Sequence, residues 1–298
     1  MSAAPLAPFR SGARALLLAL LVATTSFVAT ARAHGTLHDT IERVQSALPP
    51  TDPSGGGDAA QALLERGELK RLAGDFKGAH ADFDASANLK PERPALLFCR
   101  GALALDEGDP ASAERLVARG LELEPGTPRA WVLRATIRSR RGDGRGAIAD
   151  YDRALETTWA SGRRAPADWI LERGRLVRGL DGDEAALAGL ERALARDGEH
   201  PVLLLKTIDA ERSLGRTDAA LERLERFERA LPNEAPRTST LALRGDLLRE
   251  AGRSLEADAA YTEALATATA LPEARRSPAM RALVTRLEAR LSGRVSAR

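Results

Sequence analysis

Two histidines near the start of the chain have a spacing that suits metal binding. His34 and His38 lie in the segment His-Gly-Thr-Leu-His, and the 298-residue chain has only four histidines. After cleavage behind Ala33, the free amine, the His34 imidazole and His38 would supply three nitrogen ligands for copper, nickel or zinc. The alternative is that His38 faces solvent on a capped helix and His34 merely lies near a cleavage site. The sequence predicts no other cofactor.

Arginines that recur at regular intervals are the second candidate for chemistry. Arg71, Arg178, Arg212 and Arg249 occupy the same place in four of the six repeats described below. Guanidinium groups bind carboxylates through paired hydrogen bonds, so a groove lined by them would bind acidic or carboxylate-bearing peptide segments. The alternative is a solvated face in an arginine-rich chain, because arginine outnumbers lysine 40 to 4.

The remaining candidates for chemistry favour structural roles. Cys99 lies inside a predicted helix, where a buried small hydrophobic residue is expected rather than a reactive thiol. Asp181-Gly182-Asp183 resembles the start of a calcium loop, but the other oxygen ligands do not follow. No glycine-rich phosphate loop, HExxH, G-x-S-x-G or Cys/His catalytic pattern occurs. We therefore predict that the chain is not an enzyme.

The first thirty-three residues have the three parts of a secretory signal peptide. Arg10 and Arg14 precede an uncharged apolar run, and Ala31-Arg32-Ala33 forms a small-residue cleavage site. The alternative is a retained N-terminal membrane anchor. Removing residues 1–33 removes three arginines and no acid, so 44 basic residues become 41 against 42 acidic ones. The mature charge of −1 and export argue against a nucleic-acid partner, and the sequence predicts no membrane contact beyond the export signal.

A repeat of 34 residues fills the mature chain. The Gly-Asp pairs at 74–75, 108–109 and 142–143 recur at this period, and a fixed period of that size is typical of a solenoid. Each repeat is predicted to be two helices joined by the Gly-Asp turn. Glycine there adopts a left-handed backbone at the end of the first helix, and aspartate caps the second helix.

Six repeats align when they are counted from common starting points. The first residues are Ala60, Pro94, Pro128, Ala167, Pro201 and Thr238. The twentieth position is alanine in all six, which allows the two helices of a repeat to approach closely. The eighth position is mostly small, and the twenty-fourth is bulky: Phe83, Val117, Tyr151, Leu190, Leu224 and Tyr261. These bulky side chains are expected to fill the space between neighbouring helices.

This pattern resembles the tetratricopeptide repeat family over roughly residues 60–271. The family's large fourth residue is matched by Leu63, Leu97, Trp131, Ile170, Leu204 and Leu241. Departures are concentrated later in the chain. Ile208 replaces the small eighth residue, Phe227 replaces an alanine, Trp159 and Gly198 replace the closing proline, and residues 162–166 are inserted after the third repeat. We therefore expect irregular packing around repeats four to six.

The resemblance implies an all-α, right-handed α-solenoid of about six helix-turn-helix repeats, whose first helices line a concave groove. It also implies an exported bacterial scaffold or adaptor in the periplasm or cell envelope, binding a protein or peptide partner without catalysis. The Lys and Asn of the family's carboxylate clamp are replaced by Leu64, Glu68, Phe98 and Ala102, so that mode is not supported. The predicted groove residues are Arg71, Phe98, Leu105, Arg129, Val132, Arg140, Arg175, Arg178, Arg212 and Arg249. Among them, Phe98, Leu105 and Val132 predict an apolar patch.

The two ends complete the predicted organisation. Residues 34–48 are predicted to form a short amphipathic helix with Leu37, Ile41, Val44 and Leu48 on one stripe, followed by a flexible Pro/Gly-rich linker at 49–57. The solenoid is expected to span 58–272. Residues 273–298 are expected to form a C-terminal capping helix and tail, because a terminal repeat needs one polar face for solubility.

Overall fold

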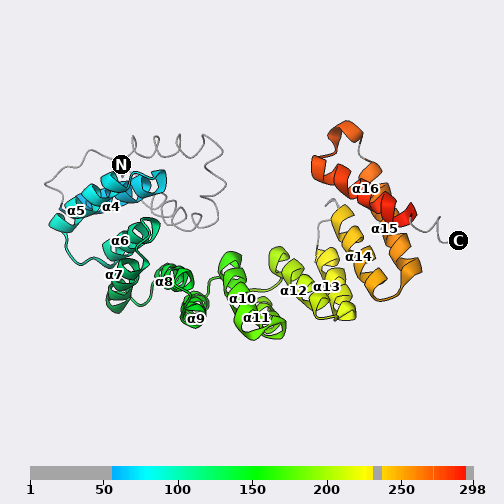
Figure 1. Ribbon diagram of the computed structural model, residues 1–298, viewed down its shortest axis with the longest axis horizontal. Coiled ribbons are helices and arrows are strands. Elements are labelled where there is room, and N and C mark those ends of the chain that lie inside the picture. The colour runs from blue at the N-terminus through cyan, green and yellow to red at the C-terminus, as the bar shows by residue number, and fades with distance from the viewer. Residues whose placement is uncertain (1–55, 231–236, 271, 293–298) are drawn as a thin grey trace, which may run out of the picture. The chain divides into compact units, whose positions relative to one another are not determined.

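The computed structural model describes residues 56–230, 237–270 and 272–292. The predicted signal peptide, the predicted helix at 34–48 and the two N-terminal histidines lie outside these residues. The described part contains thirteen α-helices, one short 3-10 helix and no strand (Figure 1). The prediction of an all-α chain of helical repeats is confirmed, while the right-handed sense of the solenoid stays a prediction.

The chain divides into two units, which are described separately. The N-terminal unit, Met1–Ala160, holds repeats one to three, and the C-terminal unit, Ser161–Arg298, holds repeats four to six. The boundary coincides with the insertion predicted at 162–166. In the N-terminal unit the helices are α4 (Gly56–Ala73), α5 (Phe76–Leu89), α6 (Pro94–Asp106), α7 (Pro110–Leu123), α8 (Pro128–Arg140) and α9 (Gly144–Ala160).

In the C-terminal unit three helix pairs are followed by one more helix. The pairs are α10 (Ala167–Asp181) with α11 (Asp183–Asp197), α12 (Pro201–Ser213) with α13 (Thr217–Ala230), and α14 (Thr238–Glu250) with α15 (Ser254–Thr269). A 3-10 turn (Glu273–Arg275) leads into α16 (Pro278–Ser292). α4 begins at Gly56, so the predicted linker end at 57 is wrong by two residues.

The turn inside each early repeat forms as its sequence predicts. Gly74, Gly108 and Gly142 have φ angles of 83°, 85° and 83°, a left-handed conformation that glycine adopts without steric cost. The following aspartate caps the second helix, as in Asp109, whose Oδ1 accepts a hydrogen bond from Ser112 N at 2.9 Å. In repeats five and six the position after the turn glycine is Arg216 or Arg253, so no aspartate cap forms there.

Small residues in the first helix make room for bulky residues in the second. A Cβ atom placed on Gly67 would lie 2.5 Å from Phe83 Cε1, and one on Gly101 would lie 2.5 Å from Val117 Cγ2. Both partners are fully buried. The eighth position therefore contacts the twenty-fourth, and this contact sets how closely the two helices of a repeat approach.

Repeat four lacks this contact and repeat five replaces it. A Cβ placed on Gly174 would have no atom within 4 Å. In repeat five, Ile208 and Phe227 are buried in one cluster with Leu224 and with Leu247 of the next repeat. The departures from the family pattern are thus accommodated by packing across the junction between repeats five and six.

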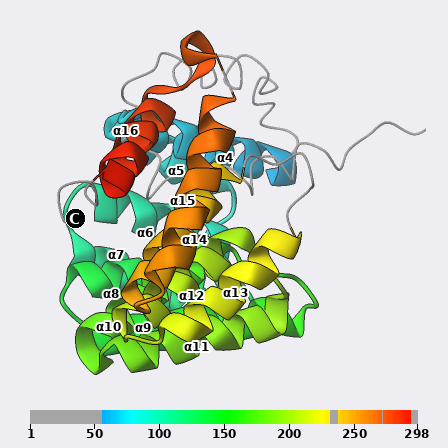
Figure 2. The ribbon, with the colours of Figure 1, turned by 90° about the vertical axis from the view of Figure 1, so that its right-hand side faces the viewer.

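The helix α16 covers the end of the C-terminal unit. It lies beside α15 (Figure 2), and its buried Leu287 joins a cluster with Ala257, Tyr261 and Ala264. Arg290 adds a polar contact, because its Nη1 donates to the Tyr261 hydroxyl at 2.9 Å and lies 2.6 Å from Asp246 Oδ1. α16 therefore has the position expected of a capping helix.

Candidate partner-binding surface

The surface that could hold a partner is the side of the first helices that is predicted to line the groove. We call it the first-helix face: the second, fifth, ninth, twelfth and thirteenth residues of α4, α6 and α8 in the N-terminal unit, and of α10, α12 and α14 in the C-terminal unit. First helices of successive repeats contact directly in both units, as α4 with α6, α6 with α8 and α10 with α12. Side chains at equal positions therefore form rows across each unit.

The fifth position forms an apolar row on this face in both units. Its members are Leu64, Phe98, Val132, Leu171, Leu205 and Ala242. Leu64 and Ala242 are buried, and the other four are half-buried. Phe98 packs against the cluster around Val117 and contacts Gly120, while Leu205 packs against the cluster around Ile208. The row seals the core between neighbouring first helices and leaves part of its apolar surface open.

Arg71, predicted to be exposed on this face, is buried, so that prediction is wrong. Its Nε donates to Glu68 Oε2 at 2.8 Å and its Nη2 donates to Glu68 Oε1 at 2.6 Å. It also pairs with Asp106 of the next repeat. Burying a guanidinium is costly unless it is paired and hydrogen-bonded, and two carboxylates supply that pairing here.

The other three arginines of the same row are also paired with acids. Arg212 Nε donates to Glu250 at 2.8 and 2.9 Å, Arg178 pairs with Asp183, and Arg249 Nη2 donates to Asp258 Oδ1 at 2.5 Å. The pairs of Arg71 and Arg212 join one repeat to the next. These arginines are therefore partly or fully neutralised by ion pairs within the chain, which disfavours a preformed anion site.

The remaining predicted groove residues differ in position. Leu105 is buried in a cluster with Val117 and Ile137, so the prediction that it lines the groove is wrong. Its side chain instead fills the core between the second and third repeats. Val132 and Arg129 are half-buried. Arg140 is exposed and its Nη1 donates to the Leu105 carbonyl at 3.4 Å, and Arg175 is exposed with Nε donating to Glu172 Oε2 at 3.0 Å.

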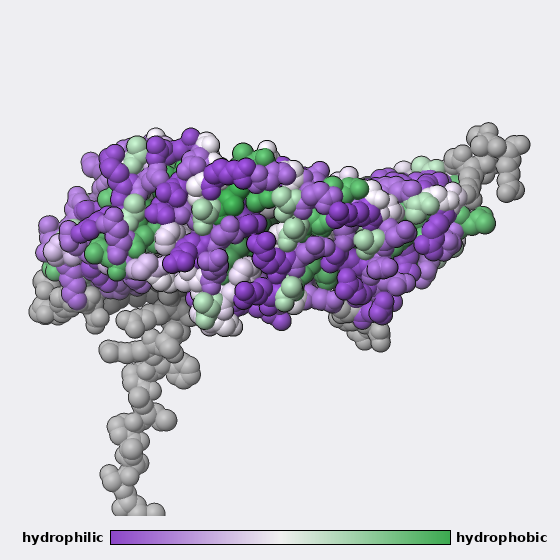
Figure 3. Space-filling view, turned by 90° about the horizontal axis from the view of Figure 1, so that it is seen from below, coloured by the Kyte–Doolittle hydropathy of each residue, from purple (hydrophilic) through white to green (hydrophobic). Residues whose placement is uncertain are grey.

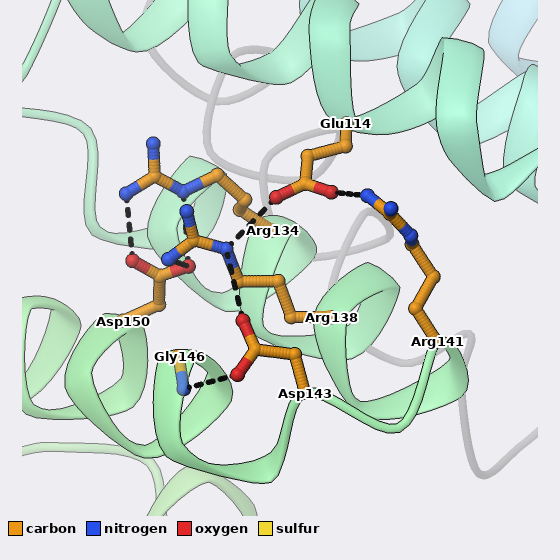
Figure 4. Close-up of polar contacts among 7 residues, drawn as sticks. All are labelled: Glu114, Arg134, Arg138, Arg141, Asp143, Gly146 and Asp150. Carbon is orange, nitrogen blue, oxygen red and sulfur yellow. Dashed lines mark hydrogen bonds and ion pairs between the residues drawn. The ribbon is translucent and has the colours of Figure 1, made fainter.

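A polar network that the sequence argument missed fixes the helices of repeat three. Arg134 Nε and Nη2 donate to the two carboxylate oxygens of buried Asp150 at 2.9 and 2.7 Å, and Arg138 Nη1 reaches Asp150 Oδ2 at 3.0 Å. Arg138 Nε also donates to Glu114 of the preceding repeat at 3.0 Å, and Arg141 pairs with the same carboxylate (Figure 4). The sequence signal was present, since arginine stands at the seventh position in five of six repeats.

The same kind of ion pair between the first and second helix recurs in repeat one. In repeat five the acid and the base exchange helices. Asp82 is held by Arg66 at 2.5 Å and by Lys70 at 2.9 Å. In repeat five the acid is Glu211 in the first helix and the base is Arg223 in the second, 2.5 Å apart. Burial alone raises the pKa of Asp82, but the hydrogen bonds from Arg66 and Lys70 outweigh it, and the pKa is lowered. These pairs are structural, because each carboxylate is satisfied by bases of its own repeat.

No alternative site for chemistry stands out among the described residues. In the part of the chain that the structure covers, no group of three or more His, Cys, Asp or Glu side chains could hold a metal ion. His34 and His38 lie outside it, so metal binding there stays a prediction. Cys99 is buried, and burial raises the pKa of its thiol, which disfavours the reactive thiolate. No described helix is long and apolar enough to span a bilayer.

Apolar surface outside the rows is scattered. Hydrophilic residues cover most of the face seen in Figure 3, with hydrophobic residues in small groups between them. Among described residues, the large hydrophobic side chains that are exposed to solvent are Leu89, Leu123, Leu180, Val202 and Leu255. Leu180 and Val202 belong to first helices, whereas Leu255 lies on the second helix of repeat six.

Comparisons with known proteins agree with the helical-repeat architecture. No family model matches the sequence. Human tetratricopeptide repeat protein 36 is 32% identical over 102 residues, which cover 34% of this chain and 53% of that protein. The chain thus matches about half the length of this curated relative.

Two solved structures share the fold at low identity. One is the C-terminal part of a TPR repeat-containing protein from Cytophaga hutchinsonii, with a TM-score of 0.56, 13% identity, and coverage of 81% of this chain and 94% of that one. The other is PilF from Pseudomonas aeruginosa, with a TM-score of 0.51, 13% identity, and coverage of 79% and 99%. At these identities the likeness concerns the fold alone.

Proposed function

We propose, from the tetratricopeptide repeat fold of this chain, that it is a non-enzymatic scaffold that binds a peptide segment of a partner protein. The observation that carries this proposal is the apolar row at the fifth position of the first helices, part of which stays open. Helical repeat proteins offer extended surfaces of this kind, because each repeat contacts only its neighbours. Fold alone does not name the partner, so the site must supply that argument.

The C-terminal unit has the more open part of this surface. Leu171 and Leu205 are half-buried there, and Val202 is 44% exposed at the second position of α12. Charged side chains such as Arg175 and Asp209 are exposed beside the row. A segment with apolar side chains on one face and charges of both signs around them would complement this pattern.

Binding of acidic segments by the arginines alone is the weaker form of the proposal. Arg178, Arg212 and Arg249 already contact Asp183, Glu250 and Asp258. An incoming carboxylate would have to displace one of these acids, and exchange of one exposed pair for another yields little free energy. We infer that apolar contacts supply most of the affinity and that the charges set orientation.

The cellular setting forms part of the same proposal. The basic start, apolar run and Ala31-Arg32-Ala33 site of residues 1–33 support export to a periplasm or cell envelope. Retention of that segment as an anchor is the alternative. N-terminal sequencing of the protein recovered from cells separates the two, since cleavage yields His34 as the first residue.

Affinity capture from the native envelope with cross-linking tests the binding surface. Val202→Glu places a charge on the first-helix face and should lower capture of the partner at least tenfold. The matched control is Leu255→Glu, because Leu255 is 81% exposed on a second helix and has the same kind of side chain. Equal capture by both variants and the unchanged protein would contradict the proposal.

A further inference from the structure

Adjacent arginines occur three times in the described chain, and the pairs differ in backbone structure. The pairs are Arg140-Arg141, Arg163-Arg164 and Arg275-Arg276. In the first pair, Arg141 N–H donates to the Ile137 carbonyl at 3.1 Å and the guanidinium pairs with Glu114. In the last pair, Arg275 belongs to the 3-10 turn and its N–H donates to the Pro272 carbonyl at 2.9 Å. The middle pair lies in irregular backbone, outside the helices and turns of residues 56–230.

The side chains of the middle pair are also more open than those of the last pair. Arg276 is half-buried, and its Nη2 donates to the Thr269 carbonyl at 3.1 Å. Arg163 and Arg164 are both exposed, and Arg163 Nε donates to the Ser161 hydroxyl at 2.9 Å. Proteases cut folded chains in exposed, irregular segments, so the backbone at the middle pair is the most open of the three to such an enzyme.

The residues that follow the middle pair are held in place, which singles out one peptide bond. Ala165 is 8% exposed, and its N–H donates to Asp197 Oδ2 at 3.2 Å. A protease contacts the residues on both sides of the bond that it cuts, so buried Ala165 protects the bond after Arg164. The bond between Arg163 and Arg164 has an exposed residue on each side.

Hydrolysis of this bond would leave the packing of all six repeats intact. The bond lies in the insertion between repeat three, which ends at 161, and repeat four, which begins at Ala167. Two apolar clusters lie within residues 64–137 of the N-terminal unit, and two more lie within residues 194–291 of the C-terminal unit. None of these four clusters of described residues includes side chains from both sides of the bond.

We propose that the peptide bond between Arg163 and Arg164 is a processing site for an endopeptidase that cuts after arginine. Such a protease binds the arginine side chain in a pocket that contains a carboxylate, as trypsin does. Water adds across the bond, which leaves a carboxylate on Arg163 and a new amine on Arg164. The two product chains hold repeats one to three and repeats four to six with α16. Cleavage here is independent of the proposed function, because it requires no partner.

Brief digestion of the mature, full-length chain with a small amount of trypsin tests the bond. Mass spectrometry of the products identifies each new N-terminus. The end that begins at Arg164 should form about tenfold faster or more than the ends that follow Arg141 and Arg275, because the backbone there must first leave a helix or turn. Arg163→Gln should slow formation of this end about tenfold or more, since the pocket requires a cation. Buried Ala165 should prevent a fast cut after Arg164 in its place.

Arg275→Gln is the matched control, and it should leave the rate of the cut after Arg163 unchanged. Equal unfolding midpoints of both variants and the unchanged protein establish that all three are folded. The fragment that begins at Arg164 should also be recovered from the cells that make the protein, and Arg163→Gln should leave only the uncut chain there. Cuts after Arg141 or Arg275 that are as fast as the cut after Arg163, or recovery of the uncut chain alone from cells, would overturn the proposal. Failure to capture a partner would contradict the proposed function and leave these results unaffected.

Discussion

Asp82 and Asp150 occupy the same position in repeats one and three and are both buried. Each receives hydrogen bonds from an arginine of the first helix, with Nη2 to Oδ1 distances of 2.5 Å from Arg66 and 2.7 Å from Arg134. Such charge-assisted pairs restrict geometry, since two parallel hydrogen bonds fix the orientation of both planes. At the residue scale, these charged side chains therefore connect the two helices of a repeat.

The lowered pKa of Asp82 predicts a loss of stability in acid. A carboxyl with a lower pKa in the folded chain binds fewer protons there, so its contribution is complete above the unfolded value of about 3.9 and is lost as the pH falls through the folded value. Asp82→Asn should cost about 1.5–3 kcal/mol at pH 7 and clearly less near pH 2. Urea unfolding at both pH values measures this, and exposed Asp84→Asn is the control with little effect at either.

Helix pairs differ in how closely they approach, and one glycine position marks the difference. Gly67 faces the buried ring of Phe83, while Gly174 faces open space at the same position of repeat four. Both are helical glycines, so their backbone costs are alike. At the element scale, the repeats are alike in their turns and unequal in their packing.

Alanine at these two glycines should change stability in opposite directions. Gly67→Ala forces the Phe83 ring to move and should destabilise the protein by about 1–3 kcal/mol, as overpacked cores do. Gly174→Ala meets no atom and should stabilise it by about 0.5–1 kcal/mol, because alanine loses less backbone freedom in a helix. Chemical denaturation of the two variants gives the comparison. Destabilisation of similar size in both would show that the space beside Gly174 is not available.

The C-terminal end of the repeat array is covered by an additional helix. The C-terminal unit ends in α16, whose Leu287 is buried while Arg286 on the same helix is exposed. Without such a helix, the cluster around Tyr261 and Ala264 would face water, which solenoid ends avoid. At the scale of the whole molecule, the described C-terminal end is thus covered by a helix that belongs to none of the six repeats.

Removing the Leu287 side chain should release the C-terminal cap. Leu287→Ala deletes a buried side chain and should cost about 2–5 kcal/mol in the unfolding of the C-terminal unit. Dye binding to exposed apolar surface and light scattering should both increase as α16 detaches. Arg286→Ala is the neighbouring control, and it should leave stability, dye binding and scattering unchanged.

The repeats and turns could be predicted from the sequence because their causes are local. Glycine with a positive φ followed by a capping aspartate acts within a few residues, and α6 and α8 begin at the prolines that start repeats two and three. The sequence also shows that arginine recurs at one place in four of the six repeats. Their exposure could not, because it depends on acids that lie up to 38 residues away, as Glu250 does from Arg212.

The sequence by itself determined the repeat period, the start of the first helix in repeats two to six and the left-handed glycine turn inside the early repeats. Only the tertiary structure decided that Arg71 and Leu105 are buried, that Gly174 faces open space, and that the ninth position is buried at Glu68 and Ala102 but exposed at Arg175 and Asp209. The physical reason is range. Backbone conformation and capping are decided by adjacent residues, whereas burial and ion pairing are decided by whichever side chains the packing of neighbouring helices brings together.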